Sequence, residues 1–252
     1  EVTLELLDSE DSVLRRFSSK APSVSPTGAP LEPMLSTNTG INILEWDLRH
    51  AGAIDVPGAG AADKALLGPI ATPGTYRVRL TVGETKYLET FELIQDPNSS
   101  ASIDDLVEQR DLLIRLRNER TGLSSAVHQV RDIRDQVEQC NNRALLASNL
   151  NSVSRLSDDL ITKLTAIEED IVQVMVDGRM DGIAYPAKLV DKIAELTVIV
   201  ASGDHPPTVQ DYDLFEDLCS RIQIVLGRLQ EIIETDLKEY LGNISELPLI
   251  KS

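Results

Sequence analysis

The side chains that most often perform acid–base or metal chemistry are sparse in this sequence. Its three histidines, His50, His128 and His205, are widely separated, and none belongs to the Glu-x-x-His pairs that mark di-iron helix bundles. Glycine-rich phosphate loops, nucleophile elbows and EF-hand loops do not occur either. The sequence therefore predicts no catalytic, cofactor-binding or metal-binding residues, and we expect a protein that is not an enzyme.

Acidic runs are the nearest approach to catalytic carboxylates, because glycosidases cleave sugars with a pair of Asp or Glu residues. The runs are Asp104–Asp105, Asp158–Asp159 and Glu168–Asp170. Each falls on or beside the polar face of an expected helix, where carboxylates are ordinarily solvated. We therefore interpret these runs as surface charge.

The two cysteines, Cys140 and Cys219, are too few for a disulfide scaffold or for a zinc site, which needs about four ligands at short spacing. Both lie among apolar helical positions, so buried free thiols are the favoured interpretation. A disulfide between them stays open, because the sequence alone does not place their Cα atoms within reach of each other.

Two long segments, residues 18–40 and 50–72, carry apolar side chains among Pro, Ser, Gly and Ala without a strand pattern. An exposed apolar cluster promotes aggregation, whereas a cluster covered by a partner forms an interface. We therefore predict that these loops bind another protein, with packing onto their own domain as the alternative. The candidate partner-binding residues are Leu31, Met34, Leu35, Ile54, Val56, Leu66, Leu67 and Ile70.

The 252 residues carry a net charge of −17, which disfavours binding to nucleic acid or to an anionic membrane surface. No apolar run approaches the roughly 20 residues that cross a bilayer, and no signal peptide is recognisable. A peripheral place on a membrane complex stays open. Because the chain starts at Glu1 rather than at Met, we expect a processed or truncated chain.

Hydrophobic alternation predicts antiparallel strands in the first part of the chain. The expected strands are residues 2–7, 12–17, 41–47, 75–82 and 85–94, with the two long loops between them. Short strands separated by turns favour a small immunoglobulin-like β-sandwich over residues 1–96. We expect Trp46, Tyr76 and Tyr87 to lie in its core.

Helical periodicity replaces the alternation after a linker at residues 97–101. Apolar residues recur every three or four positions over 102–141, over 148–176, in a shorter helix from Pro186 to Val200, and over 208–242. Ser102–Asp105 and Thr208–Asp211 have the form of N-terminal capping boxes. Short connections make neighbouring helices antiparallel, so we expect a four-helix bundle over 102–242 and a tail over 243–252. The predicted fold class is α+β with two domains.

Several segments resemble one known family. They are Val2–Asp8, Glu45–Arg49, and Gly68–Val82 with its Pro-Gly-Thr-Tyr turn, followed by Asp96-Pro97 and a helical region. Together they are similar to the C-terminal part of bacterial sortilin-like glycosyl hydrolases with BNR repeats. In that family a β-propeller is followed by an immunoglobulin-like module and then by a helical segment. The immunoglobulin-like module is similar to that of the flagellar hook-cap protein FlgD. The resemblance covers nearly the whole chain and implies a FlgD-like sandwich followed by helices.

The propeller that would carry hydrolase activity in that family is absent here, and no Asp-box pattern Ser-x-Asp-x-Gly-x-x-Trp occurs. No catalytic residue can therefore be transferred. The resemblance implies an exported bacterial protein, periplasmic or extracellular, that was cut from a longer precursor or acts as a free-standing subunit.

Two kinds of function follow from these observations. The preferred prediction is a non-catalytic interaction or scaffold subunit that docks through its sandwich loops onto a larger protein complex. The alternative is an accessory C-terminal module of a secreted glycoside hydrolase, which positions a parent propeller domain or binds carbohydrate. For carbohydrate binding only Trp46, Tyr76 and Tyr87 are candidate stacking residues, and burial in the core explains them better.

Overall fold

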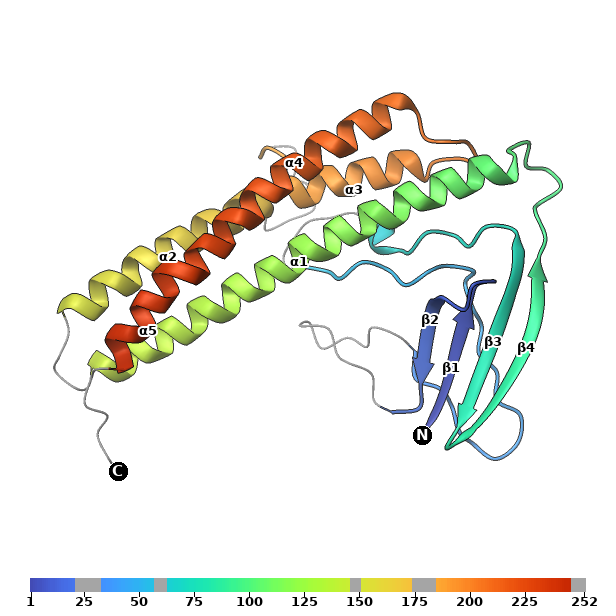
Figure 1. The fold of residues 1–252 in the computed structure, drawn as a ribbon, viewed down its shortest axis with the longest axis horizontal. Coiled ribbons are helices and arrows are strands. Elements are labelled where there is room, and N and C mark those ends of the chain that lie inside the picture. Colours follow the sequence, from blue (N-terminus) through green and yellow to red (C-terminus); the bar gives the residue numbers. More distant parts are fainter. Residues whose placement is uncertain (21–32, 57–62, 146–150, 174–184, 246–252) are drawn as a thin grey trace. The chain divides into compact units, whose positions relative to one another are not determined.

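A computed structural model describes residues 1–20, 33–56, 63–145, 151–173 and 185–245 (Figure 1). These residues divide into two compact units. The first unit contains residues 1–20, 33–56, 63–118 and 194–212, and the second contains 119–145, 151–173, 185–193 and 213–245. Strands come first in the chain and helices follow, so the mixed α+β class is confirmed. The predicted domain boundaries at 97 and 102 stay a prediction.

The first unit contains one antiparallel sheet of four strands (Figure 1). Its strands are β1 (Val2–Leu7), β2 (Val13–Ser18), β3 (Gly74–Val82) and β4 (Thr85–Leu93), in the order β2-β1-β3-β4. The long central strand β3 pairs Leu6 with Val78 on one side and Tyr76 with Phe91 on the other. Because side chains alternate along each strand, this register places the apolar residues of three strands on one face.

That apolar face forms the core of the first unit. Its buried members are Leu6, Leu14, Phe17, Leu35, Ala71 and Tyr76. Trp46 lies edge-on to Tyr76 with 6.2 Å between ring centroids, and its indole N–H donates to the Arg49 carbonyl at 2.8 Å. The Tyr76 hydroxyl donates to the Thr72 carbonyl at 2.7 Å. Trp46 and Tyr76 thus attach two irregular segments, around Trp46 and around Thr72, to the sheet.

The predicted strand at residues 41–47 is wrong, because these residues make no β-ladder. Ile41 and Ile43 are exposed, whereas Leu44 and Trp46 pack against the core. Burial alternates only from Ile43 to Asp47, and a strand also needs a neighbouring backbone with which to exchange hydrogen bonds.

Tyr87 is also not a core residue, since 56% of its surface is exposed. It lies on β4, the edge strand, beyond the part of the sheet that the segment around Trp46 covers.

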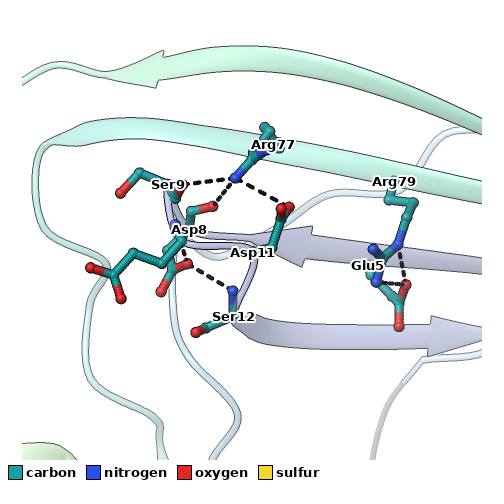
Figure 2. Close-up of polar contacts among 8 residues, drawn as sticks. Glu5, Asp8, Ser9, Asp11, Ser12, Arg77 and Arg79 are labelled. Atoms are coloured by element: carbon teal, nitrogen blue, oxygen red, sulfur yellow. Dashed lines mark hydrogen bonds and ion pairs between the residues drawn. The ribbon is translucent and has the colours of Figure 1, made fainter.

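The opposite face of the sheet carries ion pairs, which Figure 2 shows. The Arg79 guanidinium donates to the Glu5 carboxylate at 2.7 Å across the β1–β3 pair. Arg77 donates to the Ser9 carbonyl at 2.8 Å and pairs with the Asp11 carboxylate at 3.1 Å. Asp11 has a positive φ of 65°, so these contacts stabilise the tight turn between β1 and β2.

The helices begin close to where the capping patterns predict. They are α1 (Ile103–Leu145), α2 (Asn151–Ile171), α3 (Leu189–Val200), α4 (Val209–Ile232) and α5 (Lys238–Ser245), and a π-helical turn, η3 (Ile233–Leu237), joins the last two. A 3₁₀ turn, η1 (Asp63–Leu66), precedes the sheet's third strand. Helical structure continues past Gly242 to Ser245, within the segment predicted to be a tail. The predicted helical residues 148–150 and 174–176 lie outside the described residues.

Both predicted capping boxes are confirmed. At the start of α1 the Ser102 N–H donates to the Asp105 carboxylate at 2.9 Å, and the Asp105 N–H donates back to the Ser102 hydroxyl at 3.1 Å. These bonds from Ser102 lower the pKa of Asp105. Thr208 and Asp211 make the same reciprocal pair before α4, at 2.8 and 3.2 Å.

The second unit buries the apolar stripes of its helices. The fully buried residues include Leu123 and Val130 of α1, and Leu164 and Ile167 of α2. A buried carboxylate, Glu168, lies among them. Both cysteines are free and half-buried, so no disulfide joins Cys140 and Cys219.

Candidate functional site

The first unit contains a cavity of about 540 Å³. Its walls come from residues 48–49 and 67–73, from the end of β4 and the turn after it (93–99), from the first part of α1 (106–117) and from residues 197–204. We refer to this cavity as the α1 groove. Its volume lies in the range of small-ligand sites, about 300–1,000 Å³.

Two irregular segments, residues 48–53 and 66–71, pair with each other, and residues 48–49 and 67–71 of them line the groove. We call this pair of segments the floor. The His50 N–H donates to the Pro69 carbonyl at 2.9 Å, and the Ala53 N–H donates to the Leu66 carbonyl at 2.9 Å. Glycine at position 68 is essential for this approach, because a Cβ there would lie 1.9 Å from the His50 carbonyl oxygen. The close contact between the two backbone segments therefore fixes the positions of the side chains that they carry.

Three side chains of α1 attach the helix to neighbouring segments, namely the floor, Thr72 and the turn at residues 200–203. Arg117 donates from Nη1 to the Ala51 carbonyl at 3.0 Å, and Arg110 donates to the Thr72 hydroxyl at 3.1 Å. Gln109 donates to the Val200 carbonyl at 2.8 Å and also to the Gly203 carbonyl. Positions 110 and 117 are seven residues apart and so share one face of the helix. That face lines the groove.

The arginines of the groove differ in how their charge is balanced. Arg110 is paired with the carboxylate of its neighbour Asp111 at 2.6 Å. Arg49 donates to the Gly68 carbonyl at 2.9 Å, and Arg117 donates to Ala51 and to the Asn118 side-chain oxygen. Among the described residues neither Arg49 nor Arg117 has a carboxylate partner. Burial lowers the pKa of Arg117, as expected for a cation with neutral partners.

His50 lies in the floor beside these cations and is held neutral. Burial, followed by the nearby positive charges of Arg110 and Arg117, lowers its pKa from 6.5 to about 4. Its Nε2 atom is buried and has no hydrogen-bond partner in the part of the chain that the structure describes. The site thus disfavours an additional positive charge at this place.

Apolar side chains complete the walls. Leu48, Leu67, Ile70 and Ile94 each expose close to half of their surface or more. A concave surface with apolar walls and a few charged groups is typical of a binding site for an amphipathic ligand or peptide.

The structure distributes the predicted partner-binding residues over different environments. Leu67 and Ile70 are exposed and line the groove, and Met34 is exposed elsewhere in the first unit. Leu35 and Val56 are buried within this chain, Ile54 and Leu66 are half-buried, and Leu31 lies outside the described residues. The role of this set in binding a partner stays a prediction.

The sequence analysis missed the charged part of the site, namely Arg49, Arg110 and Arg117. The seven-residue spacing of the two α1 arginines was available as a signal of a shared face. Arg49 gave no such signal, because its place depends on the pairing of two irregular segments.

The acidic runs make no convergent carboxylate site in the described residues. Asp105 caps α1, while Asp158 and Asp159 border a shallow hollow on α2. Within the same residues no group of three His, Cys, Asp or Glu side chains is arranged to hold a metal ion. None of the described helices is long and apolar enough to cross a bilayer.

Comparisons with protein-family models, with curated proteins and with solved structures find no match to this chain. The resemblance to the sortilin-like glycosyl hydrolases therefore stays a prediction, and the groove has to be interpreted from its own geometry.

Proposed function

We propose that this chain is a non-catalytic interaction subunit that docks onto a larger protein complex through the loops of its N-terminal region. The proposal includes the finer fold prediction, an immunoglobulin-like sandwich over 1–96 and a four-helix bundle over 102–242. It also includes a periplasmic or extracellular location. The observation that carries it is the cluster of exposed apolar side chains around the α1 groove.

The physical reason is the free energy of that surface in water. Exposed apolar surface is unfavourable by about 25 cal/mol per Å², and monomeric proteins rarely keep it gathered around a concave site. Leu48, Leu67, Ile70 and Ile94 come from three separate segments and gather around one cavity. A protein partner that covers them would remove this surface from water.

The test is the size of the complex that the chain forms in its native cells. We expect the tagged full-length chain to elute from size exclusion well ahead of the free chain. Leu67→Asp should shift it to the position of the free chain, because the new carboxylate would be desolvated in the interface without a partner.

The matched control is Leu88→Asp on β4, since Leu88 and Leu67 are similarly exposed, at 51% and 48%. This variant should elute with the wild type, and both variants should keep the wild-type far-UV circular dichroism. Equal elution of both variants with the wild type would contradict the proposal. Elution of the wild type as a free chain would contradict it as well.

A further inference from the structure

We propose that the α1 groove binds the extended, apolar C-terminal segment of a partner polypeptide. The terminal carboxylate lies at Arg49 and Arg117, and a basic side chain upstream reaches Asp96 and Asp204. This inference rests on the proposed function and names the chemistry of the partner.

Both arginines line the groove, and each donates to one of the two paired backbone segments. Arg49 donates to the carbonyl of Gly68, and Arg117 donates to the carbonyl of Ala51. These two residues touch, because a Cβ on Gly68 would lie 2.8 Å from the Ala51 oxygen. The loop pairing therefore makes neighbours of the two residues that accept from Arg49 and Arg117, which come from different elements.

This concentration of positive charge is unusual in a chain of net charge −17. A guanidinium has five N–H donors, and Arg49 uses one of them and Arg117 three within the described residues. The remaining donors and both positive charges suit a carboxylate, which accepts hydrogen bonds from arginine in a bidentate geometry.

Near Gln109 the charge of Arg110 is balanced by Asp111, and two further carboxylates, Asp96 and Asp204, line the same cavity. Gln109 holds the turn at residues 200–203 there, and Asp204 follows that turn with an exposed carboxylate. Asp96 lines the same cavity and uses one carboxylate oxygen to accept from Asn98. An occupant with a negative end and a positive group some distance away matches this distribution.

The length of the groove sets the spacing of those charges. From Gln109 to Arg117 the helix rises about 12 Å, at 1.5 Å per residue. An extended peptide covers that distance with about four residues, at 3.3 Å each. The apolar side chains Leu67, Ile70 and Leu113 line the interval between the charged ends. The occupant is therefore a chain end with a basic residue followed by about four apolar residues.

The experiment measures fluorescence anisotropy of a labelled peptide, Lys-Val-Ala-Leu-Val, with the full-length chain. We expect the free-acid peptide to bind at least 10-fold more tightly than the same peptide with a C-terminal amide. Arg117→Gln and Arg49→Gln should each weaken the free acid at least 10-fold and abolish its advantage over the amide. Asp204→Asn should weaken the Lys peptide but leave a version with Ala in place of Lys unchanged.

Controls separate binding from folding. Arg16→Gln changes an arginine on the polar face of the sheet and should leave peptide binding unchanged. Arg117→Lys keeps the charge without the planar fork, and should bind the free acid with intermediate affinity. In the wild type, the ring signals of His50 in an NMR spectrum should shift on adding the free acid and not on adding the amide.

Equal affinity of acid and amide, or an unmoved His50 signal at saturating peptide, would overturn the inference. Binding of decanoate as tightly as the peptide would also overturn it, since the occupant would then be an aliphatic acid. The proposed function is tested by a separate experiment, and it fails if Leu67→Asp leaves the native complex intact.

Discussion

Each unit of this protein contains a pair of arginines, and the two pairs are neutralised differently. In the second unit Arg131 and Arg134 each bind one oxygen of Glu168 at 2.7 Å, and that carboxylate side chain is only 4% exposed. In the first unit Arg49 and Arg117 donate to neutral oxygens beside a cavity. A buried carboxylate completes the first arrangement within the chain. The second arrangement is suited to a carboxylate from outside.

The contrast separates a pair of arginines neutralised within the chain from a pair that we propose serves recognition. A buried carboxylate with two charge-assisted hydrogen bonds joins α1 to α2 and balances the arginine charge from within the chain. Arginines held by backbone carbonyls are oriented but not neutralised. Substitutions in the second unit should therefore affect mainly folding, and substitutions in the groove mainly binding.

The largest effect on stability should come from Glu168→Gln. It removes the negative charge that the half-buried cations Arg131 and Arg134 both contact. We expect a loss of ~2–4 kcal/mol in the free energy of unfolding, measured by urea titration.

Asp170→Asn is the matched control for Glu168→Gln, because Asp170 pairs with Arg228 at an exposed position, and it should cost less than ~1 kcal/mol. Similar losses in the two variants would mean that the buried arrangement is no more important to folding than a surface ion pair.

A smaller but still clear loss should follow Gly68→Ala. The new methyl group would meet the His50 carbonyl at 1.9 Å, so residues 48–53 and 66–71 would have to separate. We expect a loss of ~1–3 kcal/mol, measured by urea titration, together with weaker binding of the free-acid peptide.

Gly122→Ala provides the control for the glycine substitution. Nothing lies within 4 Å of a Cβ at this helical position, so the change should stabilise the chain by up to ~1 kcal/mol. Unaltered stability and peptide binding in Gly68→Ala would show that the floor pairing does not position the arginines.

The smallest effect concerns pH. Below pH 6.5 the unfolded chain takes up a proton at His50 that the folded chain does not accept until about pH 4. The free energy of unfolding therefore falls as the pH is lowered through this interval. After allowance for the partial exposure of His50 we expect ~1–2 kcal/mol, as the difference between the wild type and His50→Gln in urea titrations from pH 7 to pH 4.

Carboxylates also titrate in this interval, which is why the difference between the two proteins is the informative quantity. His205→Gln, at an exposed position in the loop after α3, should follow the wild type at every pH. Parallel curves for the wild type and His50→Gln would contradict a neutral, buried His50 next to the groove cations.

The helical part of the chain was predicted well from the sequence. The starts of α1 and α4 follow from Ser102–Asp105 and Thr208–Asp211, because a capping box depends only on residues three apart. The four strands of the sheet were also predicted, since Thr75–Val82 alternates clearly. The segment 41–47 was predicted as a strand but is not one, because it covers the sheet without joining it.

The candidate site was predicted only in part. Leu67 and Ile70 were named for their apolar character in a loop, and both line the groove. Leu35 and Val56 have the same character, yet they are buried within the chain. Whether an apolar loop residue is exposed depends on what folds over it, and local sequence does not contain that information.

The sequence by itself determined the order of strands before helices, the limits set by capping and alternation, and the strong negative charge. These properties depend on neighbouring residues and on composition. Only the tertiary structure decided which arginines are neutralised and which face a cavity. That outcome depends on contacts between residues far apart in the chain, such as Arg117 with Ala51 and Arg131 with Glu168.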